Sequence, residues 1–293
     1  MRESSELLKK VRRIEIKTRG LSQSIFAGEY HSAFKGRGMT FAEVREYQYG
    51  DDIRDIDWNV TARQNKPFVK VYEEERELTV MLLVDMSRSR IFGAVGEEKR
   101  QMIAEIAATI AFSAISNNDK IGVIFFTDKI EKFIPPKKGR RHILFIISQL
   151  LDFEPQSEGT DIAMAVRYFS DALKRRCTAF LISDFIDGHD YVRPLEIAAR
   201  KHDVIGVQVY DKRDSILPDV GLMRMRDLET GAEQWVDTSS TKVRKMFSRW
   251  WYDRQQAMSG TLSHCRVDYV SVATDEDFVQ SLMALFKRRG TGA

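Results

Sequence analysis

Three short segments of the sequence carry oxygen-bearing side chains of the kind that bind metal ions. They lie at residues 85–89, 159–161 and 183–184. The side chains that could share one ion are two carboxylates and three hydroxyls: Asp85, Asp184, Ser87, Ser89 and Thr160. An all-oxygen set with few charges suits a hard cation that keeps part of its water, whereas zinc favours nitrogen and sulfur ligands. These residues therefore predict a site for Mg²⁺ or Mn²⁺.

The charge of this predicted set is too small to satisfy a divalent ion on its own. Two carboxylates leave a coordination position that a carboxylate from another molecule can fill. We therefore expect a protein partner that presents Asp or Glu to the ion. The residues that flank the ligands, and that we expect to contact this partner, are Arg88, Gly159 and Asp161.

Alternating strand and helix patterns position these segments. Short apolar runs predict buried strands at residues 78–85, 120–127, 177–184, 204–210 and 266–272. Helical patterns lie between them, at residues 97–117, 141–151, 161–173, 191–201 and 239–258, with a last helix after Asp275. A short run at 130–134 follows a turn and predicts an antiparallel edge strand.

This alternation predicts an α/β fold with a doubly wound, mostly parallel sheet and helices on both faces. Ligands of such sheets bind beyond the carboxyl ends of the strands, where the strand order reverses. If the strands at 78–85 and 177–184 are central neighbours, all three oxygen-bearing segments meet at that edge.

The chain of 293 residues is long for one domain, and its texture changes at residue 78. Residues 1–77 hold a basic amphipathic helix near the start, then a stretch rich in turn signals with short strand-like pieces. We predict a small, irregular, β-rich N-terminal appendage there. Residues 78–293 form the predicted α/β domain.

Composition narrows the classes of function. The 46 Lys and Arg residues nearly balance the 43 Asp and Glu residues, so the net charge of +3 does not point to nucleic acid. The two cysteines cannot form a disulfide scaffold or a zinc cluster. No apolar run approaches the roughly 20 residues of a transmembrane helix, and the N-terminus has no secretory pattern. We expect a cytoplasmic protein without a transmembrane segment.

Two motifs resemble known families. The run Asp85-Met86-Ser87-Arg88-Ser89, with Thr160 and Asp184, resembles the metal-ion-dependent adhesion site (MIDAS) of von Willebrand factor A domains. Upstream, Phe34-Lys35-Gly36-Arg37-Gly38, Gly50-Asp51-Asp52-Ile53-Arg54-Asp55-Ile56-Asp57-Trp58 and Thr61-Ala62-Arg63 resemble the bacterial family catalogued as domain of unknown function 58.

The resemblance implies roles for the matching residues and a class of partner. Ser87, Ser89 and Thr160 would bind the ion directly, while Asp85 and Asp184 would act directly or through water. The family is often encoded beside MoxR-type AAA+ ATPases and other von Willebrand factor A proteins, which are therefore the implied partners. The implied fold is that of a von Willebrand factor A domain.

An acidic cluster and a tryptophan pair allow alternatives. Asp51, Asp52, Asp55 and Asp57 could act with Asp85 and Asp184 in a metal-dependent phosphoester hydrolase. We favour a turn whose carboxylates cap amides or pair with Arg45, Arg54 and Arg63. Trp250 and Trp251 could form a docking site, but helical spacing favours core packing.

The sequence thus predicts a non-enzymatic, metal-dependent protein–protein interaction module. We expect it to act as an adaptor for an AAA+ ATPase in the assembly or maturation of a protein complex. The hydrolase is the alternative hypothesis.

Overall fold

The computed structural model describes residues 9–16, 30, 38–75, 78–87, 93–157, 159–226 and 233–291. These residues fall into two compact units. One comprises Phe34–Glu77, and the other comprises the rest of the described chain.

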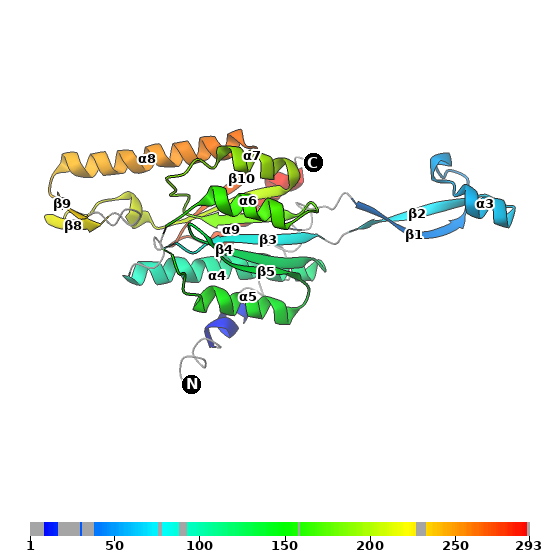
Figure 1. Ribbon diagram of the computed structural model, residues 1–293, viewed down its shortest axis with the longest axis horizontal. Helices are drawn as coiled ribbons and strands as arrows, with labels where there is room; N and C mark the ends of the chain where they lie inside the picture. The colour runs from blue at the N-terminus through cyan, green and yellow to red at the C-terminus, as the bar shows by residue number, and fades with distance from the viewer. Residues whose placement is uncertain are drawn as a thin grey trace. The chain divides into compact units, whose positions relative to one another are not determined.

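The larger unit is built on a six-stranded sheet (Figure 1). Its strands lie in the spatial order β10-β7-β6-β3-β4-β5. Their bounds are Thr79–Asp85 for β3, Lys120–Phe126 for β4, Ile130–Lys137 for β5, Thr178–Ser183 for β6, Asp203–Tyr210 for β7 and Asp268–Ala273 for β10. All neighbours are parallel except β4 and β5. The strands β3 and β6 are central neighbours, which meets the condition set from the sequence, and the predicted antiparallel edge strand is confirmed.

Helices cover both faces of this sheet, as predicted (Figure 1). Their bounds are Gly93–Ser116 for α4, Arg140–Asp152 for α5, Ile162–Ala172 for α6, Val192–Lys201 for α7, Thr241–His264 for α8 and Phe278–Thr291 for α9. Side chains of α6, α7 and α8 share one core cluster with alternate residues of β3 and β6, including Met81, Leu83, Ala179 and Leu181. Because successive strand residues point to opposite faces, the residues between them pack on the other face. There the Phe180 ring meets Phe286 of α9.

The strands are nearly continuous apolar runs, and this explains why they form a buried parallel sheet. All residues of β6 are buried, as are the last six of β3 and of β4. Such runs are stable only where both faces are covered. Among the helices in the described ranges, none has the length and apolar character needed to cross a bilayer.

The start of the chain groups with the larger unit, whereas the sequence placed it with the appendage. Residues 9–16 are helical, with Val11 and Ile14 buried. Glu15 pairs with Arg140 at the start of α5. Further on, the buried Tyr30 donates a hydrogen bond to Asp119 and meets Phe286 edge-on. Apolar packing and these polar contacts account for the grouping.

The smaller unit is more regular than predicted. It contains an antiparallel pair, β1 (Gly38–Glu46) and β2 (Phe68–Glu75). Between these strands lie a 3-10 turn, η2 (Ile53–Asp55), and a helix, α3 (Trp58–Gln64). The sequence did not predict α3, because its seven residues are too few to show a helical period.

The last third of the chain adds a hairpin and a long helix. After β7 come the 3-10 turn η4 (Lys212–Ser215) and the antiparallel pair β8 (Leu222–Arg226) and β9 (Glu233–Asp237). Helix α8 runs to His264, past the predicted end near residue 258. The core-packing interpretation of the tryptophan pair is correct for Trp251, which is buried, but wrong for Trp250, which is 45% exposed.

A buried histidine makes the stability of this fold dependent on pH. His202 follows α7, and its ring lies against Phe169 with a centroid separation of 4.5 Å. Its Nδ1 contacts Cys177 Sγ at 3.3 Å, and burial lowers the pKa of His202 to about 4. In the unfolded chain the pKa of His202 is near 6.5. At a pH between the two pKa values, His202 is therefore protonated in the unfolded chain and neutral in the folded one.

We predict that acidification from about pH 7 to about pH 5 lowers the free energy of unfolding by about 2 kcal/mol through this residue. The sign follows because protons bind preferentially to the unfolded state over this window. Urea unfolding at both pH values measures the effect. His202→Phe should flatten the pH dependence, and the exposed His264→Gln should leave it as in the wild type. An unchanged slope in His202→Phe would contradict the assignment.

Candidate functional site

Two buried carboxylates lie at the carboxyl ends of neighbouring parallel strands. Asp85 is the last residue of β3, and Asp184 directly follows β6. Val84 pairs with Ile182, so the two strands end level with each other. The hydroxyl of Ser183 donates a hydrogen bond to Asp85 Oδ2 at 2.5 Å. Strand pairing and this hydrogen bond bring the first and third predicted segments together.

The turn after β3 is held by the same carboxylate. Asp85 Oδ1 accepts a hydrogen bond from the Ser87 amide at 2.9 Å, and Ser87 is buried. The amide of Met86 donates to the carbonyl of Phe126 at the end of β4. Both carboxylate oxygens of Asp85 thus accept a hydrogen bond, one from its own turn and one from the last residue of β6. Arg88 and Ser89 lie outside the described residues, and their roles stay predictions.

The second predicted segment lies at the same edge. The amide of Asp161 donates to the carbonyl of Thr127, the residue after β4. The Asp161 side chain caps α6 by accepting a hydrogen bond from the Met164 amide at 2.7 Å. Thr160 is buried, and Gly159 lies beside Asp128. Four of the five predicted ligands are therefore buried at one strand edge, and the carboxylate of Asp161 has a structural role there.

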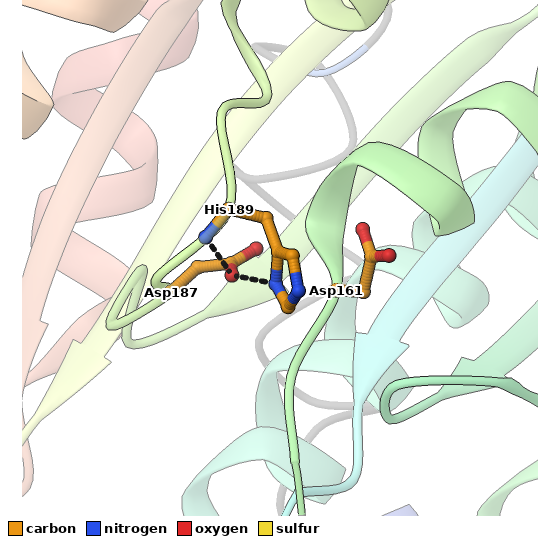
Figure 2. A group of neighbouring side chains, drawn as sticks. All are labelled: Asp161, Asp187 and His189. Carbon is orange, nitrogen blue, oxygen red and sulfur yellow. Dashed lines mark hydrogen bonds and ion pairs between the residues drawn. The ribbon is translucent and has the colours of Figure 1, made fainter. Parts of the chain in front are cut away.

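Two residues that the sequence reasoning missed join this segment to the loop after β6 (Figure 2). His189 Nδ1 lies 2.8 Å from Asp187 Oδ1 and 3.1 Å from the carbonyl oxygen of Thr160. Both neighbours are acceptors, so Nδ1 carries the proton. Asp187 Oδ2 accepts a hydrogen bond from the Ile162 amide at 2.7 Å. The only sequence signal was the Asp187-Gly188-His189 spacing soon after a strand end.

Asp161, Asp187 and His189 form a second group with possible ligand atoms within 4.8 Å of one another. The hydrogen bond to Asp187, together with its negative charge, raises the pKa of His189. Asp187 already accepts hydrogen bonds from the Ile162 amide at the start of α6, from the His189 amide and from the imidazole. Structural hydrogen bonds therefore account for the geometry of this group without an ion.

One buried carboxylate oxygen at the strand edge accepts no such hydrogen bond from the described residues. Asp184 is 3% exposed, and its Oδ1 accepts a hydrogen bond from the Ile186 amide at 3.0 Å. Its Oδ2 is buried and has no hydrogen-bond partner among the described residues. A buried carboxylate oxygen without a partner is costly, and a bound cation removes that cost. The side chains at this edge therefore fit a hard metal ion.

The backbone after Asp184 takes an uncommon conformation. Phe185 has φ of 58°, in the left-handed region that non-glycine residues rarely adopt. Ser183 Oγ accepts a hydrogen bond from the Phe185 amide at 3.0 Å, and Gln208 donates to the carbonyl of Asp184 at 3.2 Å. These contacts hold the backbone at Asp184 and Phe185, and strain of this kind is typical of functional sites.

The strand order, the antiparallel edge strand and the helices on both faces confirm the predicted α/β fold with a mostly parallel sheet. The chain belongs to the family described as "Protein of unknown function DUF58", whose model matches residues 43–257. An uncharacterized protein of Mycobacterium tuberculosis is 30% identical over 285 residues, covering 97% of this chain and 90% of the relative. The uncharacterized protein YeaD of Bacillus subtilis is 26% identical over 131 residues, covering 45% of this chain and 29% of YeaD.

Solved structures show more distant likenesses. An aerotolerance-related membrane protein from Bacteroides fragilis matches with a TM-score of 0.47 and 14% identity, covering 74% of this chain and 100% of that protein. Proximal thread matrix protein 1 from the mussel byssus, with a zinc-occupied MIDAS motif, matches with a TM-score of 0.38 and 19% identity, covering 46% of this chain and 38% of that protein.

We predict that Ser183→Ala lowers the free energy of unfolding by about 2 kcal/mol, because it removes a hydrogen bond to a buried carboxylate and leaves the Phe185 amide without its acceptor. Ser170→Ala is a matched control, since the Ser170 hydroxyl is buried without a hydrogen-bond partner among the described residues. Urea unfolding compares the two variants. Equal stability of both would show that Ser183 does not hold this edge together.

Proposed function

We propose that this protein is a metal-dependent protein–protein interaction module whose bound ion takes a carboxylate from a partner. The observation that carries the proposal is the unpartnered, buried Asp184 Oδ2 at the strand edge where Asp85 also ends. Two anionic groups in a dry environment favour a cation. The nearby hydroxyls favour a hard one, Mg²⁺ or Mn²⁺.

In this proposal each predicted ligand has its own role at the ion. Ser87, Ser89 and Thr160 supply hydroxyl ligands, and Asp85 and Asp184 bind directly or through water. Asp85 is already fixed by hydrogen bonds to Ser183 and to its own turn. The ligand set leaves a position for an Asp or Glu of the partner. Arg88, Gly159 and Asp161 would lie around that position.

The hydrolase alternative has no specific support. Asp51 accepts two hydrogen bonds from Arg45, at 2.7 and 2.8 Å. Asp52 accepts a bond from the Arg54 amide, and Asp57 caps α3 and pairs with Lys70 rather than Arg63. These carboxylates have the capping and pairing roles that we favoured. We propose that Phe34–Glu77 serves as a separate module and not as part of a catalytic centre.

The resemblance to the family suggests the identity of the partner. We propose an adaptor that works with a MoxR-type AAA+ ATPase, and with other von Willebrand factor A proteins, in the assembly or maturation of a protein complex. A partner carboxylate that binds only with the ion would let such an adaptor engage and release its target. A cytoplasmic location stays a prediction.

We predict that Mg²⁺ or Mn²⁺ stabilises the protein, by about 2.7 kcal/mol at a hundredfold excess over the dissociation constant. Asp184→Asn should abolish this gain without lowering the stability of the metal-free protein, because it removes a buried charge that lacks a partner. Thermal unfolding with each ion, with Zn²⁺ and with a chelator measures both effects. Asp171→Asn, on the exposed face of α6, is the control that should respond like the wild type.

We also predict that purified MoxR-type ATPase from the same organism binds the wild-type protein in Mg²⁺. A chelator, or the double substitution Ser87→Ala/Ser89→Ala, should weaken this binding at least about tenfold, which corresponds to about 1.4 kcal/mol. Calorimetry or surface binding measures the affinity. Binding that is unchanged by Asp85→Ala or by the chelator would rule out the metal-dependent contact, even if metal itself binds.

A further inference from the structure

The first half of α8 extends beyond the carboxyl edge of the sheet (Figure 1). Leu262, near the end of the helix, lies against Gly206 in the middle of β7. Trp251 contacts Tyr210, the last residue of β7, with ring centroids 6.0 Å apart. The helix therefore runs antiparallel to β7. The ten residues before Trp251 continue past the strand end for about 15 Å, at 1.5 Å per residue.

Helix α8 has two different apolar faces. The inner face carries Trp251, Met258 and Leu262, which follow the projecting segment and are buried against the domain. On the outer face, Met246 is 63% and Trp250 is 45% exposed. Large apolar side chains gathered on one exposed face usually mark an interaction site.

The outer face is also positively charged and has only a shallow, open groove. Met246 and Trp250 line a surface groove of about 910 Å³, and the charged residues that line it are Lys242, Lys245, Arg249, Asp253 and Arg254. Four cations thus face one carboxylate. Arg249 pairs with Asp253, and Arg254 lies over the Trp250 ring at 5.3 Å. Lys242 and Lys245 are exposed and form no ion pair within the described ranges. The described residues therefore leave the positive charge of the groove without a neutralising partner.

We propose that this α8 face, defined by Lys242, Lys245, Met246, Arg249 and Trp250, docks an acidic amphipathic segment of a protein partner. An apolar side chain of the segment fills the groove over Met246 and Trp250. Its carboxylates pair with the lysines and Arg249. This site goes beyond the proposed metal site, because none of its residues is a metal ligand.

Three features favour a protein segment over an anionic membrane or nucleic acid. Met246 and Trp250 offer exposed apolar contacts to protein side chains, and one residue that lines the shallow groove is an aspartate, which would repel phosphates. The projecting half of the helix also lies beyond the carboxyl edge of the sheet, where the proposed ion takes a protein carboxylate. One partner could therefore reach both places.

The test uses a fluorescent synthetic peptide of about five helical turns, with Leu and Trp on one face and Glu beside them. Binding to the full chain is measured by anisotropy in a chelator, so that the metal site plays no part. We expect Lys245→Glu/Arg249→Glu to weaken binding at least about tenfold, because two attractions become repulsions. We expect Met246→Ser to weaken binding too, and a scrambled peptide of equal charge to bind more weakly.

A charge exchange separates recognition from misfolding. A peptide with Lys in place of Glu should bind Lys245→Glu/Arg249→Glu more tightly than it binds the wild type. Lys174→Glu/Arg175→Glu, before β6 at the opposite edge, is the matched control and should bind the acidic peptide like the wild type. Equal loss in this control, or no loss in the α8 variant, overturns the proposal. So does binding to vesicles of phosphatidylcholine and phosphatidylglycerol in equal parts without binding to the peptide.

Discussion

Parallel pairing of β3 and β6 forces the carboxylates of Asp85 and Asp184 to the same edge of the sheet, where both are buried. Two anions in a medium of low polarity destabilise each other and lose hydration. For Asp85, hydrogen bonds from the Ser183 hydroxyl and the Ser87 amide offset this cost. For Asp184, only one carboxylate oxygen accepts a hydrogen bond from the described residues. The remaining charge is the physical reason for expecting a cation there, and the loops around it are arranged to keep the oxygens in place.

Those loops have no helix or strand to hold them, so side chains fix their backbones. Asp187 binds the first amide of α6, and the His189 imidazole binds both Asp187 and the carbonyl of Thr160. Ser183 holds Phe185 in its left-handed conformation. Fixed loops lower the entropy that a ligand must remove on binding. Preorganisation of this kind is what a site needs if its ion and its partner are to exchange without refolding the domain.

The sequence predicts the sheet well because each buried strand is an apolar run and each intervening helix has its own period. It also predicts the strand-edge position of Asp85, Thr160 and Asp184, since that position follows from topology alone. It misses α3, the role of His189 and the exposure of Trp250. These depend on capping by Asp57, on contacts between distant loops and on where α8 leaves the domain. Periodicity contains none of this information, because it describes one segment at a time.

Specificity is the last constraint on the proposed function. A single partner carboxylate at an ion is a small contact, and any protein with an exposed Asp or Glu could supply it. Specific interfaces usually bury about 800 Å² on each partner. The projecting half of α8 offers additional area beside the strand edge, with exposed apolar side chains and cations that neutral or basic segments would not match. We infer that the ion controls whether a partner binds and that α8 selects which partner. The two controls are separable because no residue belongs to both sites.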